Sequence, residues 1–213
     1  MLNSPVGSNE SHQLELPRAW ESRTVKALQK VVEQEEPILV FLIETKLNKE
    51  KVEKVRDQCN FKFSWVVPSE GRSGGLALFW KDGIEFEILE VDQSHIDTLV
   101  KGGVSTDWWH LTSFYEAPKT SRRDESWALL KVIRDTSTVP WLVIGDFNEI
   151  VSVSEKEGGG SRPRRQMKNF TDTLNWCGLR DMGFVGPRFT WLYQMVDGGQ
   201  TRERLDRAVV SLA

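Results

Sequence analysis

Two short, continuous apolar runs constrain the fold of this chain more than any other feature of its sequence. They span Ile38–Ile43 and Val139–Ile144, and each is followed by polar residues. Runs of this length without polar alternation are typical of strands that are buried on both faces. The two runs therefore predict core strands that lie side by side, with their ends converging.

The segments around these runs alternate between helical and strand patterns. Helical spacing predicts helices near 19–36, 49–60, 121–135 and 166–176, and short strands are expected near 61–67, 76–80, 84–91, 98–100, 108–115, 188–193 and 202–210. Residues 154–165 are rich in glycine and basic residues, which predicts a loop. We expect an α/β fold, a two-layer β-sandwich flanked by helices, in one domain over 17–213 that follows a disordered leader over 1–16.

Composition limits the class of protein. The chain has 213 residues, 39% of them hydrophobic, which is enough for one sizeable core. Its formal net charge of -3 argues against a uniformly basic nucleic-acid-binding protein, although a local basic patch is compatible with it. Cys59 and Cys177 lie far apart without metal-ligand spacing, so we expect two buried thiols in an intracellular protein. No signal peptide and no run of membrane-spanning length is evident.

Polar residues stand where the apolar strands end. Glu44 follows the first run, Tyr115 ends the strand near 108–115, and Asp146 and Asn148 follow the second run within Gly-Asp-Phe-Asn. Magnesium takes oxygen ligands, one or two of them carboxylates, so Glu44 and Asp146 are candidate ligands. On an extended chain Asp146 and Asn148 would point the same way and could orient water and phosphate together. The alternative for each is a residue that merely ends a strand.

Five motifs occur in a familiar order. They are Ile43-Glu-Thr-Lys46, Thr112-Ser-Phe-Tyr115, Gly145-Asp-Phe-Asn148, Phe189-Thr-Trp191 and Arg204-Leu-Asp-Arg207. In this order they resemble the endonuclease/exonuclease/phosphatase superfamily, which includes exonuclease III and deoxyribonuclease I. The amino-acid sequence of these motifs is most similar to that of the endonuclease domain of plant non-LTR (LINE-type) retrotransposons, and the resemblance runs from about residue 18 to residue 210. The resemblance implies the exonuclease III-like sandwich and a metal-dependent DNA endonuclease that was originally fused to a reverse transcriptase.

The resemblance also implies a role for each matching residue. Glu44 would bind Mg²⁺ or Mn²⁺, and Tyr115 would contact the phosphate. Asp146 would position or deprotonate the attacking water beside Asn148, which would bind the scissile phosphate. Trp191 would border the substrate nucleotide, and Asp206 would orient its neighbours, unless it simply pairs with Arg204 or Arg207.

The sequence departs from the family pattern at both ends. Family members open with a strand that carries an Asn and close with Ser-Asp-His, and neither motif occurs in these 213 residues. The three histidines are His12, His95 and His110, for which we expect no catalytic role. We therefore expect a domain that is truncated at both ends, with an open sheet edge beside Glu44. Loss of one general acid or base lowers a rate by about 10²–10⁴-fold, so we expect weak metal binding and little or no phosphodiester cleavage.

Two functions from different classes remain open. The first is a metal-dependent phosphodiesterase that acts on DNA, and therefore in the nucleus. The second is a non-catalytic remnant or nucleic-acid-binding module of the same fold, in which the basic loop residues Arg162, Arg164 and Arg165 contact phosphates. A small-molecule or lipid phosphatase of this fold is a weaker alternative, because the motifs resemble those of retroelement domains more closely. Oligomeric state and DNA preference are not indicated by the sequence.

Overall fold

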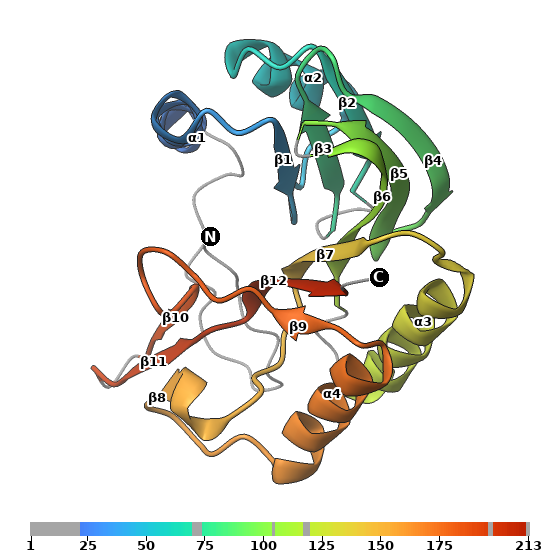
Figure 1. The fold of residues 1–213 in the computed structure, drawn as a ribbon. Helices are drawn as coiled ribbons and strands as arrows, with labels where there is room; N and C mark the ends of the chain where they lie inside the picture. The colour runs from blue at the N-terminus through green and yellow to red at the C-terminus, as the bar shows by residue number, and fades with distance from the viewer. Residues whose placement is uncertain (1–21, 70–73, 104, 117–119, 196–197, 212–213) are drawn as a thin grey trace. The chain divides into compact units, whose positions relative to one another are not determined.

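The computed structural model describes residues 22–69, 74–103, 105–116, 120–195 and 198–211. These residues fall into two compact units that divide between Ser113 and Phe114, which we call the N-terminal and the C-terminal unit. Each unit contains sheets flanked by two helices, so the expected α/β class is confirmed (Figure 1). The leader expected over 1–16 and the first residues of the first expected helix lie outside the described residues.

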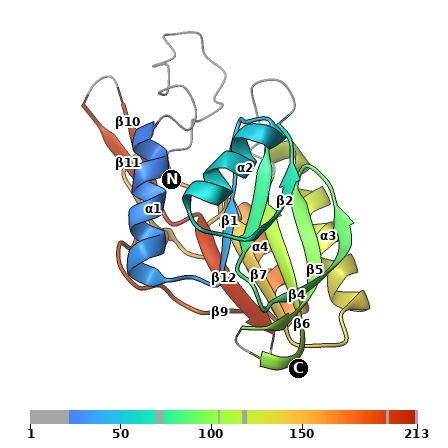
Figure 2. The same cartoon turned by 90° about the horizontal axis from the view of Figure 1, so that it is seen from above.

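The N-terminal unit begins with two helices packed on a three-stranded sheet. Its elements are α1 (Ser22–Glu35), β1 (Leu39–Leu42), α2 (Lys49–Gln58), β2 (Phe63–Val67) and β3 (Leu76–Trp80). The sheet order is β1-β3-β2, and both pairs are antiparallel. Val25 and Val32 of α1 and Val52 and Val55 of α2 share one apolar cluster with Phe79 of β3. Figure 2 shows α2 lying over this sheet.

The same unit continues as a meander of β4 (Glu85–Val91), β5 (His95–Gly102) and β6 (Ser105–Tyr115). A buried polar cluster joins β5 to β6: the Asp97 carboxylate lies 2.8 Å from His110 Nε2 and accepts a hydrogen bond from the Thr112 hydroxyl at 2.5 Å. The His95 ring pairs with Asp92 and is 1% exposed. These contacts agree with the structural role that we expected for both histidines.

The C-terminal unit starts at the last residues of β6 and contains the larger apolar core. Its remaining elements are α3 (Arg123–Thr136), β7 (Trp141–Asp146), β8 (Lys156–Glu157), α4 (Arg164–Trp176), β9 (Arg180–Asp181), β10 (Trp191–Gln194), β11 (Gln200–Glu203) and β12 (Asp206–Ser211), with short 3-10 turns at Thr120–Arg122 and Val153–Glu155. The end of β6, β7, β12 and β9 are successive neighbours in one sheet, and β10-β11-β8 form another. Helices α3 and α4 pack together (Figure 1). Trp127 of α3 stacks on Phe170 of α4, and both belong to one apolar cluster with the buried Trp141.

Three expectations need correction. The apolar runs that became β1 and β7 are not neighbouring strands, because β1 pairs with β3 whereas β7 lies between β6 and β12. The strand expected over 202–210 is divided, since Arg204 and Leu205 separate β11 from β12. The loop expected over 154–165 contains β8, which pairs with β11. Local patterns do not encode these pairings, which depend on residues distant in the sequence.

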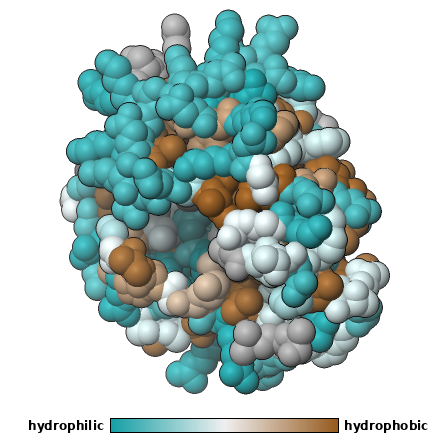
Figure 3. Space-filling model, turned by 45° about the horizontal axis from the view of Figure 1, so that its top comes forward, coloured by the Kyte–Doolittle hydropathy of each residue, from teal (hydrophilic) through white to brown (hydrophobic). Residues whose placement is uncertain are grey.

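Surface and helix composition agree with an ordinary globular chain. Figure 3 shows a face on which apolar side chains form separate patches among hydrophilic ones. Within the described ranges, no helix has the length and apolar character that crossing a membrane requires.

The edge position of β1 leads to a prediction about its stability. Among the described residues β1 pairs only with β3, and its four residues are half-buried, whereas β7 has a neighbour on each side. Amides of an edge strand that face away from the neighbouring strand lack a ladder partner, so they exchange through smaller openings. We expect lower hydrogen-exchange protection at Leu39–Leu42 than at Trp141–Ile144, measured by NMR. Equal protection of the two strands would contradict the edge assignment.

Candidate active site

The Gly145-Asp-Phe-Asn148 turn lies at the end of β7, where the backbone of Gly145 comes close to that of Phe114 in β6. Gly145 has φ +146°, and a Cβ at this position would lie 1.8 Å from the carbonyl oxygen of Phe114. Only glycine fits such an approach. Beyond it, the Glu116 amide donates to the Asp146 carbonyl at 2.9 Å, so the ends of the two strands are joined.

Asp146 and Asn148 form a tight turn instead of an extended segment. Asn148 has φ +47°, which corrects the expected extended geometry. Its amide N–H donates to Asp146 Oδ1 at 2.7 Å, and its side-chain Nδ2 donates to the carbonyl of Glu116 at 2.9 Å. Asp146 is fully buried and Asn148 is half-buried. The turn therefore holds both side chains in fixed positions, at the cost of a left-handed backbone that is uncommon outside glycine.

Asp206 lies directly opposite Asp146, because β12 pairs with β7 in the register Asp206↔Asp146. Side chains directly opposite each other on antiparallel strands have Cβ atoms about 4.5–5.5 Å apart, so two carboxyl groups share this site. Thr190 Oγ1 accepts hydrogen bonds from the amides of Leu205 and Asp206, both at 3.0 Å, which fixes the start of β12. Burial raises the pKa of Asp206 above its usual range.

The alternative partners of Asp206 are engaged elsewhere. Arg204 and Arg207 form ion pairs with Glu155 and with Asp181, at 2.7 to 2.9 Å. No ion pair joins either arginine to Asp206 in the part of the chain that the structure describes. The Asp206 carboxyl is therefore not a simple counter-ion of its sequence neighbours.

Tyr115 and Trp191 complete the group of predicted residues in this unit. Tyr115 ends β6 one residue before Glu116 and is 7% exposed. Trp191 begins β10, is half-buried, and stacks on Tyr193 with the ring centroids 6.0 Å apart. Tyr115, Asp146 and Asp206 thus occupy the ends of three neighbouring strands, with Asn148 just beyond them. This is the arrangement expected of side chains that act together at a strand end.

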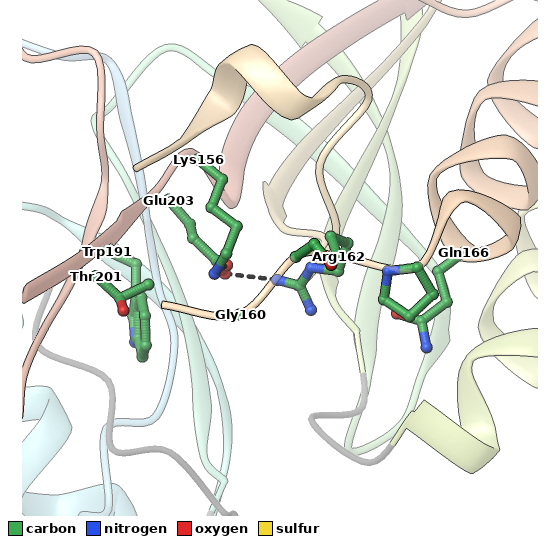
Figure 4. A pocket seen from close by; sticks show the side chains of 9 residues that line it. Lys156, Gly160, Arg162, Gln166, Trp191, Thr201 and Glu203 are labelled. Atoms are coloured by element: carbon green, nitrogen blue, oxygen red, sulfur yellow. Dashed lines mark hydrogen bonds and ion pairs between the residues drawn. The ribbon is translucent and has the colours of Figure 1, made fainter. Parts of the chain in front are cut away.

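A pocket of about 290 Å³ adjoins Trp191. Figure 4 shows Trp191 and Thr201 on one side of it and Arg162 and Gln166 on the other, with Lys156 and Glu203 between them. Glu203 accepts a hydrogen bond from Arg162 at 2.5 Å and also binds the Lys156 ammonium group. The wall consequently carries two cations and one carboxylate. Arg162 is a member of a partly buried ion pair, whereas Arg164 and Arg165 are exposed at the start of α4.

Glu44 lies in the N-terminal unit, directly after β1. It has φ +49°, and its side chain is 17% exposed with Oε2 3.6 Å from the Lys46 ammonium group. The following amides donate to the opposite loop, Thr45 to Gly75 and Lys46 to Gly74. Across the described segments no three Asp, Glu, His or Cys residues are grouped as a metal site. A single partly exposed carboxylate suits magnesium, which keeps several waters and uses substrate phosphate as a ligand.

Two buried residues beside the turn were not identified from the sequence. Glu149 is fully buried and binds Arg123 at 2.5 Å, and Ile150 donates its amide to the same carboxylate at 2.9 Å. Glu116 is also fully buried, yet neither of its side-chain oxygens accepts a hydrogen bond from any described residue. Its nearest cation is Arg123, whose Nε lies 3.4 Å away. Burial raises the pKa of Glu116 to about 9 against the charge of Arg123, so this side chain is neutral at pH 7.

No feature of the sequence marks Glu116, because a glutamate that follows an apolar segment and precedes Ala-Pro in the sequence ordinarily faces solvent. Glu149 follows Asn148 directly and could have been included on that ground alone.

Comparison with known proteins was made on sequence and on structure. A model of the "Endonuclease/Exonuclease/phosphatase family" matches residues 7–213. A search among curated proteins gives no match. The fold is similar to AP endonuclease LMAP from Leishmania major, with a TM-score of 0.65 and 17% identity over 89% of this chain and 74% of that one. It is also similar to the endonuclease domain of TRAS1, a telomere-specific non-LTR retrotransposon, with a TM-score of 0.64 and 12% identity over 90% and 80% of the two chains. A third similar structure is the 3' phosphatase NExo from Neisseria bound to product DNA hairpin, with a TM-score of 0.63 and 17% identity over 89% and 82%.

The buried Glu116 carboxyl predicts a pH-dependent stability. Its pKa is about 9 in the folded chain and near 4.5 when unfolded, so between these values the folded chain binds more protons. The free energy of unfolding should therefore fall as pH rises from about 5 to 9, by up to about 1.4 kcal/mol per pH unit. Glu116→Gln should remove this slope in urea titrations. Glu125→Gln, a substitution at an exposed position of α3, should retain it. A slope that is unchanged in Glu116→Gln would show that this carboxyl is ionised at neutral pH.

Proposed function

Because the chain belongs to the endonuclease/exonuclease/phosphatase family, we propose that it is a retroelement-derived, metal-dependent phosphodiesterase domain whose substrate is DNA. The observation that carries this proposal is the meeting of Asp146, Asn148 and Asp206 at neighbouring strand ends. Hydrolysis of a phosphodiester requires a positioned water and donors that bind the phosphate, and these residue types can provide both. Action on DNA places the protein in the nucleus, and fusion to a reverse transcriptase is part of the same proposal.

Each residue has a proposed role that its surroundings support. Asp146 positions or deprotonates the attacking water, since it is buried and its Oδ1 is oriented by the Asn148 amide. One Nδ2 hydrogen of Asn148 donates to the Glu116 carbonyl, and the second Nδ2 hydrogen would donate to the scissile phosphate. The Tyr115 hydroxyl contacts the same phosphate, and Asp206 orients Asp146 across the strand pair. Within the N-terminal unit, Glu44 would hold magnesium, an ion that neutralises charge on a phosphate when bound.

The pocket beside Trp191 is the proposed place of a substrate nucleotide. An aromatic ring at the wall of a pocket provides a stacking surface for a base, and the Arg162, Gln166 and Thr201 side chains supply hydrogen-bonding groups. Arg164 and Arg165 are exposed at the N-terminus of α4, where they can contact the phosphates of a nucleic-acid backbone. Arg162 contributes less charge, because Glu203 and Glu149 neutralise it.

The proposed activity of these 213 residues is low. A general acid for the leaving oxygen is commonly a histidine, but His95 and His110 are buried against Asp92 and Asp97 in the N-terminal unit. The second candidate function, a nucleic-acid-binding module without turnover, is favoured by this burial. Both functions predict DNA binding, and only the first predicts cleavage.

A plasmid-nicking assay with magnesium separates the two. We expect the 213-residue chain to nick supercoiled DNA about 10²–10⁴-fold more slowly than a family member in which a histidine serves as general acid, the range associated with loss of one general acid or base. Fusion of an Asn-bearing first strand and a C-terminal Ser-Asp-His strand should restore nicking, and Asp146→Asn in the fused protein should abolish it. Glu125→Gln serves as the matched control. Rapid nicking by the unextended chain, lost on Asp146→Asn, would contradict the proposed low activity.

Metal binding can be measured without turnover. Mn²⁺ is paramagnetic and substitutes for magnesium at oxygen sites, so it should broaden the NMR signals of the Thr45 and Lys46 amides at millimolar concentration. Glu44→Gln should eliminate this broadening, whereas Glu53→Gln on α2 should not. Broadening that persists in Glu44→Gln would assign the ion to another residue.

A further inference from the structure

The loop between β9 and β10 exposes apolar side chains to solvent. Met182 is 62% exposed, Phe184 is 53% exposed and Val185 is fully exposed at 105%. We call Met182–Gly186 the apolar loop. Single exposed apolar residues are common, but three within four positions on a narrow loop indicate a surface that another molecule covers.

Both ends of the apolar loop are fixed to the strand that carries Asp206. The Met182 amide donates to the carbonyl of Ala208, and Asp181 forms ion pairs with Arg204 and Arg207. At the other end, Thr190 donates its amide to Glu203 and accepts the amide of Asp206. The apolar loop therefore begins beside β12, at the end of β9, and the segment that follows it bonds to the start of β12 at Asp206 of the candidate active site.

The surroundings of the apolar loop are basic. The Arg204 guanidinium lies 5.1 Å from the centroid of the Phe184 ring. Arg180 and Arg188 flank the loop in sequence and are exposed, and no carboxylate within the described residues pairs with either. The carboxylates of Asp181 and Glu155 pair with Arg204 and Arg207, so these four side chains balance one another and the positive charge of this surface comes from Arg180 and Arg188. The surface therefore combines an apolar tip with unneutralised positive charge.

This combination fits duplex DNA. Proteins that deform DNA insert apolar side chains between base steps while flanking basic residues contact the phosphates. We propose that the apolar loop is a wedge that enters duplex DNA beside the active site, with Phe184 and Val185 inserted at a base step and Arg180 and Arg188 on the adjacent phosphates. The proposal rests on the proposed DNA substrate and adds the element that would deform it.

Binding is tested in EDTA, where cleavage does not occur, with a fluorescein-labelled 20-base-pair duplex and the full 213-residue chain. Phe184→Ser should weaken binding by roughly tenfold, the scale of losing one base–aromatic contact, and Phe184→Trp should retain affinity. Val185→Ser should also weaken binding, and it cannot unfold the chain through lost contacts because Val185 is fully exposed. Val132→Ser, at an apolar α3 position that is 61% exposed, is the matched control and should bind as the unmodified chain does.

Two further measurements test the wedge itself. A duplex with 2-aminopurine at successive positions should gain fluorescence at one step on binding, because insertion unstacks the base, and Val185→Ser should lose this gain. Arg188→Gln should lower the slope of log affinity against log salt concentration by about 0.9, the value for one phosphate contact.

The outcomes separate this proposal from the proposed function. If the duplex binds but Phe184→Ser and Val185→Ser match the control, the wedge is wrong and the DNA-directed function survives. If the chain binds no duplex at all, both are wrong. Self-association of the chain that Val185→Ser abolishes, together with DNA binding that it leaves unchanged, would assign the apolar loop to a second copy and overturn the proposal.

Discussion

The Glu155 carboxylate accepts hydrogen bonds from the guanidinium groups of Arg204 and Arg207, which lie 49 and 52 positions further along the chain. Asp181 binds the same two arginines from the other side. Since these arginines are 7% and 5% exposed, each needs its partners to offset the loss of hydration. The four side chains therefore fix the junction of β11 and β12, and with it the position of Asp206.

A second set of charges acts on the Gly-Asp-Phe-Asn turn. Glu149, the residue after Asn148, forms ion pairs with Arg123 on α3 and with Arg162 beside the pocket. Arg162 forms a further ion pair with Glu203. The turn, the first helical residue of α3 and the pocket wall are consequently joined by one series of ion pairs. Preorganisation of this kind is what holds catalytic groups in place before a substrate arrives. It also means that the basic loop is mainly a structural part of the C-terminal unit and only its outer arginines face solvent.

The fold could be predicted from periodicity to a large extent, because both apolar runs became strands and the four expected helices correspond to α1–α4. Periodicity could not predict which strands pair with one another, since β1 and β7 have the same apolar pattern but belong to different sheets. The candidate site residues of the C-terminal unit were selected through their motifs. Glu116 was not selected, since its burial depends on Arg123 and on the turn 30 residues later. The left-handed φ of Asn148 follows from contacts with Asp146 and Glu116, which the sequence does not show, so an extended backbone was predicted there.

The Gly145 contact has a consequence for how such sequences change over time. A side chain at this position would collide with the backbone of β6, and Asp146 and Asn148 hold the same turn closed through their hydrogen bonds. Substitutions here would be removed by selection for a folded chain even if no strand of DNA were ever cut. The presence of the Gly-Asp-Phe-Asn sequence is therefore explained by folding constraints alone, and it does not by itself show that a chain turns over a substrate.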